Sequence, residues 1–246
     1  MRYRVDTIKI NKKQVKMVAH RGASGLEREN TVPAFVAAGN RSYFGVETDV
    51  HRTADGLYVI IHDETTSRVS RGAVNINVEE SPYAAVRDIV LPDKDGSTVR
   101  QDIRIPLLGE YVHVCKKYDK TCVLELKNAF TRAEIREIVA IIREYGYLQR
   151  VIFISFVWEN CVTLRDLLPD QPVQWLTAKE ITDEQVEAMA QHRLGLDAYY
   201  PLLSADLVAR LHARGLEVNC WTVDDPLWAE KLVDMGVDYI TSNILE

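Results

Sequence analysis

The chain has 246 residues, of which 47% are hydrophobic, and it carries a formal net charge of -6 with a pI near 5.6. This length is close to the roughly 250 residues of a (β/α)8 barrel, and it favours a single domain over residues 1–246. The acidic balance argues against a nucleic-acid partner, because a protein that binds nucleic acid usually carries a basic stripe that neutralises phosphates.

The sequence shows no sign of a membrane span or of export. No stretch approaches the roughly 18 consecutive apolar residues of a membrane span, and the N-terminal MRYRVDTIKINKK lacks the apolar centre of a signal peptide. We therefore predict a cytoplasmic protein. The cysteines form no Cys-x-x-Cys pair, which predicts buried, reduced thiols without a catalytic role. They are Cys115, Cys122, Cys161 and Cys220.

Eight short β-rich runs follow one another along the chain, with helical patterns between them. They are VKMVAH (15–20), FGVETDV (44–50), KTCVLEL (120–126), RVIFISF (150–156), PVQWL (172–176), LGLDAYY (194–200), LEVNCW (216–221) and VDYIT (237–241). Amphipathic segments that end near a Gly span 131–147, 204–215 and 225–236. This alternation predicts an α/β protein with a parallel sheet, either closed or doubly wound.

Residues 51–105 interrupt the alternation. They begin with HRTADGLYVIIHD (51–63), in which Asp55-Gly56 is a turn signal for a hairpin that extends the second strand and returns antiparallel to it. The polar remainder is long for a connection. Long ordered segments of this kind often form lids or pocket walls. We therefore predict an insertion at about 64–105, between the second and third barrel strands, that folds over the mouth of the barrel.

Acidic side chains alternate along the second predicted strand. Glu47 and Asp49 are two residues apart, so on a strand both side chains point the same way, about 7 Å apart. Inside a barrel, two like charges repel each other unless a cation or a shared proton compensates. The same alternation turns Glu125 and Lys127 of the third barrel strand inward. Three carboxylates without a thiolate suit Mg²⁺ or Ca²⁺ better than Zn²⁺, although charges facing solvent on an edge strand are the alternative.

Two histidines end predicted strands near these acids. His20 and Arg21 lead into the glycine-bearing turn 22–25, whose backbone can approach an anion closely. His62 ends the return strand of the hairpin, and His51 either faces the site or lies on its rim. Two histidines beside a metal can supply a base and an acid near neutral pH. We expect only structural roles for the other histidines, which are His113, His192 and His212.

A series of short motifs extends from His20 to about Thr241. In chain order they are AHRG, E-N-T, E-x-D-V-H, T-x-D-G-x-x-V-I-x-H-D, I-P-L-L, E-L-K, S-F and W-T-V. In this order the sequence resembles the glycerophosphodiester phosphodiesterase family over nearly the whole chain. The resemblance implies a (β/α)8 TIM barrel with an insertion after the second strand. It also implies metal-dependent hydrolysis of a small glycerophosphodiester to glycerol 3-phosphate and an alcohol.

The resemblance assigns the chemistry to particular residues. His20 and His62 match the catalytic histidines of the family, and which is base and which is acid stays open. Arg21 and Lys127 match its phosphate-contacting cations. Trp221 matches the aromatic wall against the glycerol. The residues matching its ligands for Mg²⁺ or Ca²⁺ are Glu47, Asp49 and Glu125, and Glu29 matches a residue that helps to organise the site.

The sequence departs from the family pattern at three places. Arg28 stands where a Pro usually precedes E-N-T, Asp224 replaces the usual Asn after W-T-V, and Thr241-Ser242 stands where Thr-Asp is common. None of these changes affects the two histidines or the three acids. Two other functions stay open: a phospholipase-D-type enzyme acting on lysophospholipids, and a barrel that only binds phosphorylated ligands. An exposed apolar rim would favour the first, and loss of the acid-base pair would favour the second.

Overall fold

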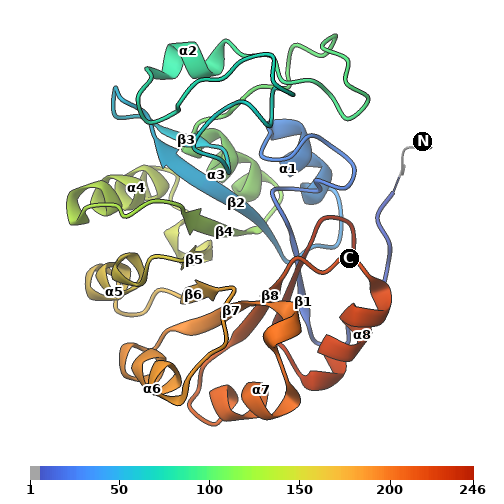
Figure 1. Cartoon of the computed structure of the whole chain (residues 1–246), viewed down its shortest axis with the longest axis vertical. Coiled ribbons are helices and arrows are strands. Elements are labelled where there is room, and N and C mark those ends of the chain that lie inside the picture. Colours follow the sequence, from blue (N-terminus) through green and yellow to red (C-terminus); the bar gives the residue numbers. More distant parts are fainter. Residues whose placement is uncertain (1–5) are drawn as a thin grey trace.

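A computed structural model describes residues 6–246 and shows a closed barrel of eight parallel strands (Figure 1). The strands are β1 (Lys16–Ala19), β2 (Gly45–Arg52), β4 (Thr121–Leu126), β5 (Val151–Ser155), β6 (Val173–Thr177), β7 (Gly195–Tyr199), β8 (Val218–Trp221) and β9 (Tyr239–Ser242). The barrel closes because β1 pairs with both β2 and β9. The predicted fold is confirmed, and each of the eight predicted runs overlaps a strand.

Helices surround the barrel between successive strands (Figure 1). They are α1 (Val32–Gly39), α3 (Leu108–Lys117), α4 (Arg132–Glu144), α5 (Trp158–Leu167), α6 (Asp183–His192), α7 (Ala205–His212) and α8 (Pro226–Met235), with short 3₁₀ turns at Leu148–Arg150 and Tyr200–Leu202. No helix among the described residues is long and apolar enough to cross a membrane.

The start of α4 shows how the local sequence sets a helix boundary. The Thr131 hydroxyl accepts a hydrogen bond from the Glu134 backbone N–H, and the Glu134 carboxylate accepts one from the Thr131 N–H. This capping box satisfies two N–H groups that a helix start otherwise leaves unpaired. The apolar residues that follow recur at three- and four-residue spacing, so they form one buried stripe against the barrel. They are Ile135, Ile138, Val139 and Ile142.

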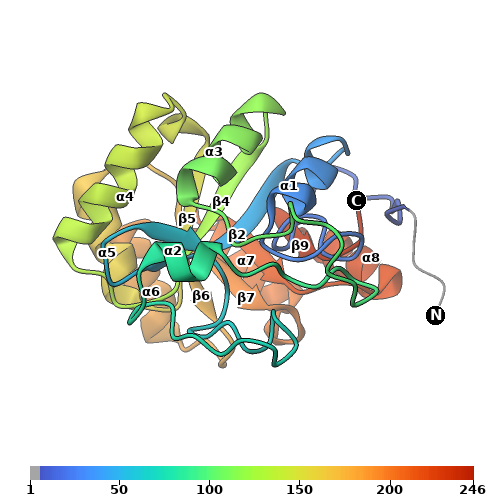
Figure 2. The ribbon, with the colours of Figure 1, turned by 90° about the horizontal axis from the view of Figure 1, so that it is seen from above.

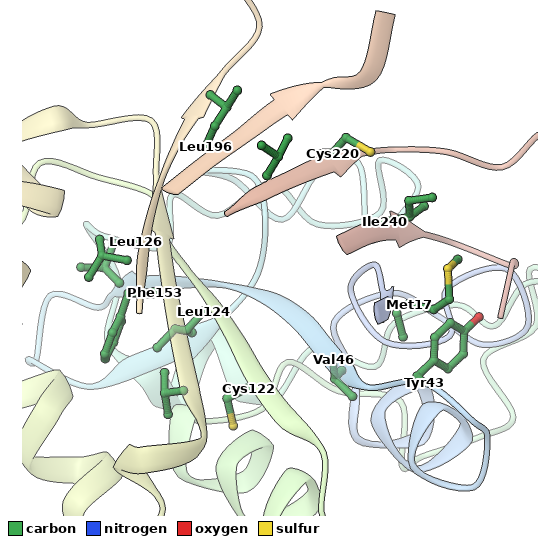
Figure 3. Packing of buried hydrophobic residues seen from close by; sticks show 14 of the residues in the cluster. Met17, Tyr43, Val46, Cys122, Leu124, Leu126, Phe153, Leu196, Cys220 and Ile240 are labelled. Carbon is green, nitrogen blue, oxygen red and sulfur yellow. The ribbon is translucent and has the colours of Figure 1, made fainter. Parts of the chain in front are cut away.

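Alternate residues of each barrel strand point in opposite directions. Those facing the helices form the large outer core, which includes Met17, Leu124 and Phe153 (Figure 3). The inward-facing set is a smaller apolar cluster that fills the barrel interior: Val18, Val123, Ile152, Ile154, Leu176 and Tyr239. This two-sided burial explains why the strands read as nearly continuous apolar runs. All four cysteines are free and buried, as predicted.

The hairpin and insertion follow β2. Strand β3 (Tyr58–Ile60) pairs antiparallel with β2, and Gly56 between them has a φ of +84°, a conformation that favours glycine. The insertion contains the short helix α2 (Tyr83–Arg87) and has an apolar cluster of its own. Figures 1 and 2 place the insertion at one side of the barrel, beside β3 and α1.

Polar contacts tie the insertion to the loop between β1 and α1. The Arg100 guanidinium lies 2.8 Å from Glu27 Oε2, and Lys94 Nζ donates to the Ser24 carbonyl oxygen at 2.5 Å. These contacts hold the insertion next to the turn that follows His20.

Candidate active site

A cavity opens where the barrel strands end, with an empty volume of about 470 Å³ that includes space open to solvent. Its walls are formed by His20, Arg21, Glu47, His62, Glu125, Ile154, Phe156, Leu176, Asp197, Trp221 and Thr241. Among the described residues, none from 64–105 contributes to this wall. The insertion therefore lies beside the mouth, contrary to the prediction that it covers the mouth, because its own apolar cluster and its contacts to the β1–α1 loop hold it there.

Three buried carboxylates meet at one end of this cavity. Glu47 and Asp49 lie on β2, and Glu125 lies on β4 directly beside Asp49 in the strand register. Each residue has a carboxylate oxygen within 4.8 Å of an oxygen of the other two. The prediction that the three side chains converge agrees with this geometry. In residues 6–246 this is the only cluster of acidic, histidine or cysteine side chains that could hold a metal ion.

Two cations border the acids. Lys127 Nζ lies 2.9 Å from Glu125 Oε1 and 3.5 Å from Asp49 Oδ1. Arg21 Nε lies 3.5 Å from Asp49 Oδ2 on the other side. Burial alone would raise the pKa of Asp49, but these two positive charges lower it below its ordinary value.

The pKa values of the other two acids, Glu47 and Glu125, shift upward. Burial, together with the negative charge of Asp49, raises the pKa of Glu47 well above its ordinary value. The same two causes raise the pKa of Glu125 to about 8. With only two cations nearby, three ionised carboxylates are therefore unfavourable unless another positive charge joins them.

This donor set fits a hard divalent cation. Asp49 Oδ1 is buried and has no hydrogen-bond partner, although each oxygen of a buried carboxylate normally has one. Carboxylate oxygens are also the ligands that Mg²⁺ and Ca²⁺ prefer. Glu47, Asp49 and Glu125 together therefore have the charge and the unused acceptor that such an ion requires.

His20 lies at the end of β1 and lines the cavity. Its Nδ1 is 2.8 Å from Asn243 Oδ1, and its Nε2 is 3.9 Å from Glu47 Oε2. Burial, with a further effect of the Arg21 charge, lowers the pKa of His20 to about 4. The imidazole is therefore neutral near pH 7 and can accept a proton from a polarised hydroxyl group.

His62 lines the same cavity and follows β3. Its Nδ1 lies 2.6 Å from Asp63 Oδ1, so a carboxylate accepts the Nδ1 proton. Burial lowers the pKa of His62, while the Asp63 hydrogen bond and the Asp49 charge oppose that shift. His51 lies behind His62, with Nε2 3.2 Å from the His62 carbonyl oxygen and Nδ1 3.0 Å from Glu79 Oε1. It is not among the residues that line the cavity.

Arg21 and Glu29 shape the turn after β1. Arg21 has a φ of +53°, which directs its backbone N–H to Glu47 Oε2 at 2.8 Å. A Cβ on Gly22 would come within 2.8 Å of Ala34 backbone atoms, so only glycine fits there. The Arg21 side chain donates to Glu29 Oε1 at 2.9 Å. Glu29 thus holds Arg21 and is not among the residues that line the cavity.

Aromatic side chains form the wall opposite the charged groups. Trp221 lines the cavity, and its ring lies 5.7 Å from that of Phe156 and 5.8 Å from that of Tyr199. Phe156 and Tyr199 are 43% and 41% exposed, respectively. The cavity therefore has one charged wall and one apolar wall.

Four polar or aromatic residues at the site were not predicted from the sequence. Asp63 and Asn243 hold the two histidines, and Phe156 forms part of the aromatic wall. Asp197 is buried and lines the cavity, its Oδ1 has no hydrogen-bond partner, and burial raises its pKa well above the ordinary value. Its inward direction could have been read from the alternation in LGLDAYY, where Leu196 and Ala198 face the helices.

Comparison with known proteins places this geometry in a family. Residues 20–245 match the glycerophosphoryl diester phosphodiesterase family. A glycerophosphodiester phosphodiesterase of Caldanaerobacter subterraneus subsp. tengcongensis is 28% identical over 229 residues, which cover 92% of this chain and 93% of that protein.

Solved structures agree with the sequence match. A putative glycerophosphoryl diester phosphodiesterase of Silicibacter pomeroyi superposes with a TM-score of 0.83 at 27% identity, covering 97% of this chain and 91% of that one. An Oleispira antarctica phosphodiesterase in complex with the product sn-glycerol-3-phosphate gives a TM-score of 0.81 at 25% identity, covering 96% and 95%. The chain therefore belongs to the glycerophosphoryl diester phosphodiesterase family and is a phosphoric diester hydrolase.

Proposed function

We propose that the chain hydrolyses small glycerophosphodiesters to glycerol 3-phosphate and an alcohol, with a divalent cation and with His20 and His62 as the acid-base pair. The observation that carries this proposal is that both imidazoles line one cavity beside the buried carboxylate cluster. The product bound to the Oleispira antarctica relative supports the same substrate class.

Glu47, Asp49 and Glu125 would hold the cation, Mg²⁺ or Ca²⁺. When bound, it supplies positive charge that polarises a phosphoryl oxygen. Arg21 and Lys127 would contact the remaining phosphoryl oxygens, because both cations border the acids, although only Arg21 lines the cavity itself. Glu29 holds the Arg21 guanidinium in place, and Trp221 packs against the glycerol carbons.

The hydrogen bonds of the two histidines favour different roles. His20 donates from Nδ1 to an amide oxygen, which leaves the Nε2 lone pair free, so His20 is the base. His62 donates from Nδ1 to the Asp63 carboxylate, which stabilises a positive imidazolium, so His62 is the acid.

The proton transfers follow from these roles. The nucleophile is a water molecule or a hydroxyl group of the substrate glycerol, and it loses its proton to His20 Nε2 as its oxygen bonds to phosphorus. The bond from phosphorus to the alcohol oxygen breaks, and His62 donates its Nε2 proton to that oxygen. Where the glycerol hydroxyl is the nucleophile, the first product is a cyclic phosphate. A water molecule then opens it to glycerol 3-phosphate, losing its proton to His62 while His20 protonates the ring oxygen that leaves.

An assay with and without metal tests the proposed function. We expect hydrolysis of glycerophosphocholine and glycerophosphoethanolamine to stop after exhaustive chelation and to return when Mg²⁺ or Ca²⁺ is added. Full activity in the chelated protein would contradict the assigned cation site. Binding of glycerol phosphate without any turnover under all metal conditions would instead indicate a binding protein.

A second function is favoured by one observation. Phe156 and Tyr199 expose apolar surface beside Trp221, at the rim of the cavity. Such a rim could hold the acyl chain of a lysophospholipid. Hydrolysis of lysophosphatidylcholine to choline at a rate equal to or above that for glycerophosphocholine would favour this function.

We also propose that the protein is cytoplasmic and that residues 1–246 form a single domain.

A further inference from the structure

Behind His20, hydrogen bonds lead through Asn243 to Asp224. Asn243 Oδ1 lies 2.8 Å from His20 Nδ1, and Asn243 Nδ2 lies 2.6 Å from Asp224 Oδ2. Asn243 follows β9 and Asp224 follows β8, so this series of hydrogen bonds links the ends of two neighbouring barrel strands. Asp224 is exposed and is not among the residues that line the cavity.

The donor and the acceptor of each hydrogen bond between Asp224, Asn243 and His20 can be assigned from chemistry. An ionised carboxylate only accepts hydrogen bonds, so the Asn243 side-chain atom that faces Asp224 must be the NH₂ group. The atom that faces His20 is then the carbonyl oxygen, which also accepts from the Ser24 hydroxyl at 2.6 Å. A carbonyl oxygen requires a donor, so Nδ1 of neutral His20 carries the hydrogen and Nε2 carries the lone pair.

We propose that Asp224 is a positioning residue that fixes the tautomer of His20 through the amide of Asn243. This inference rests on the proposed function, in which His20 Nε2 accepts a proton from the nucleophile. Asp224 touches neither His20 nor the cavity, so it acts only through Asn243.

Both oxygens of Asp224 accept hydrogen bonds, which explains why an amide at this position would not serve in this protein, where position 242 is a serine. Oδ1 accepts from the Ser242 hydroxyl at 2.9 Å and from the Asn243 backbone N–H at 2.8 Å, while Oδ2 accepts from Asn243 Nδ2. Asparagine has one oxygen. If that oxygen keeps the two Oδ1 contacts, its NH₂ group faces the NH₂ group of Asn243 and repels it.

The Asn243 amide then turns over to relieve this repulsion. Its NH₂ group faces His20 Nδ1, which must now accept, and the hydrogen of the neutral imidazole moves to Nε2. That nitrogen can no longer accept a proton from the nucleophile.

The test compares two adjacent substitutions in the full chain. Asp224→Asn removes one acceptor from the series of hydrogen bonds that leads to His20. Asp225→Asn is the matched control, because it makes the same chemical change at the next residue, whose side chain caps α8 by accepting from the Leu227 N–H at 2.8 Å. Asparagine caps a helix as well as aspartate does, so the control should fold normally.

The direct readout is the ¹⁵N NMR spectrum of protein labelled in its histidine rings, which distinguishes the protonated ring nitrogen from the unprotonated one. We expect an Nδ1–H tautomer for His20 in the wild type and in Asp225→Asn, and an Nε2–H tautomer in Asp224→Asn. We also expect kcat on glycerophosphocholine to fall about 10- to 100-fold in Asp224→Asn, as is usual for an outer-shell partner, with KM nearly unchanged.

Two results overturn different parts of the argument. An Nδ1–H tautomer in Asp224→Asn, in a protein whose thermal unfolding matches the wild type, would overturn the positioning role. A change of tautomer with kcat intact would leave the positioning role standing and would contradict the proposed role of His20 as the base.

Discussion

At the scale of single residues, the two cavity histidines differ in the partner of Nδ1. An amide oxygen holds His20, and a carboxylate holds His62. The carboxylate stabilises a positive ring far better than the amide does, and in the proposed mechanism this difference separates the base, His20, from the acid, His62. The sequence predicted both histidines but could not separate their roles, because Asn243 lies 223 residues from His20 in the chain.

Removing either histidine should cost most of the turnover. We expect His20→Ala and His62→Ala each to lower kcat by about 10²- to 10⁴-fold, the usual contribution of one general acid or base. Binding of glycerol phosphate should change much less, because the carboxylates and both cations stay in place. His113→Ala is the control, since His113 is exposed on α3. Steady-state kinetics and calorimetry check both expectations, and an unchanged kcat in both variants would rule out acid-base catalysis by this pair.

Two departures from the family pattern meet in one contact. The Ser242 hydroxyl donates to Asp224 Oδ1 at 2.9 Å, so the acidic group that is common at position 242 in the family stands here at position 224. We expect Asp224→Asn with Ser242→Asp to regain part of the kcat lost in Asp224→Asn alone, because the double variant returns a carboxylate to the same cluster. Kinetics of the three proteins measure the recovery. A double variant no more active than the single one would show that the two positions do not compensate.

At the scale of elements, the insertion acts on the site through Arg68. Its Nη1 donates to Glu29 Oε2 at 2.8 Å and its Nε to Asp63 Oδ2 at 2.6 Å. One guanidinium therefore holds the acid that positions Arg21 and the acid that positions His62. Sequence patterns predicted the insertion but not its place, because these ion pairs depend on the folded arrangement of three separate segments.

The Arg68 network predicts a pH-dependent stability. Burial alone would raise the pKa values of Glu29 and Asp63, but hydrogen bonds from Arg68 lower each to about 2 from ordinary values of 4.5 and 3.8. A carboxyl group with a lowered pKa stabilises the fold fully above its ordinary pKa, and the stabilisation is lost as pH falls toward the folded-state value. Arg68→Gln should therefore reduce the free energy of unfolding at pH 7, by about 1 kcal/mol after allowance for solvent screening, and by less at pH 3.

Denaturant unfolding at pH 7 and pH 3 measures this difference. Arg71→Gln is the control, because the Arg71 side chain donates hydrogen bonds to the carbonyl oxygens of Asp93 and Lys94 and takes no part in the pairing of Glu29 and Asp63 with Arg68. An effect of Arg68→Gln that is equal at both pH values would show that the ion pairs do not carry the stabilisation.

The barrel elements themselves were largely predictable. Each strand is a short apolar run, and strand alternation predicts that Glu47, Asp49 and Glu125 lie on the inner face, where the structure has them. The position of the insertion was not predictable, because the local sequence does not show that its apolar residues pack against β3 and against one another.

At the scale of the whole molecule, closure of the barrel assembles the site. β1 pairs with β9 as well as with β2, so His20 from the beginning of the chain meets Asn243 from its end. Parallel strands place all their carboxyl ends at one mouth, where such barrels carry their active sites. The ends of strands β1, β2 and β4 supply the charged wall. Strands β5, β6 and β8 supply apolar residues of the other wall, with the buried Asp197 of β7 between those of β6 and β8.

The separation of the cavity into a charged wall and an apolar wall predicts that the apolar wall determines which alcohol group the site accepts. Phe156 lines the cavity and contacts Trp221 but carries no group that could act on phosphorus. Phe156→Ala should raise KM for lysophosphatidylcholine about tenfold, since the lost apolar and aromatic contacts are worth about 1–2 kcal/mol, and it should leave kcat nearly unchanged. KM for glycerophosphoinositol should change much less, because its head group is polar.

Leu227→Ala is the matched control for this experiment. Leu227 is 69% exposed on α8 and is absent from the residues that line the cavity. The measurement is kcat and KM for both substrates in the wild type and the two variants. Equal increases in KM for the two substrates would show that Phe156 contacts the glycerol half common to both, and that the apolar wall does not select the alcohol.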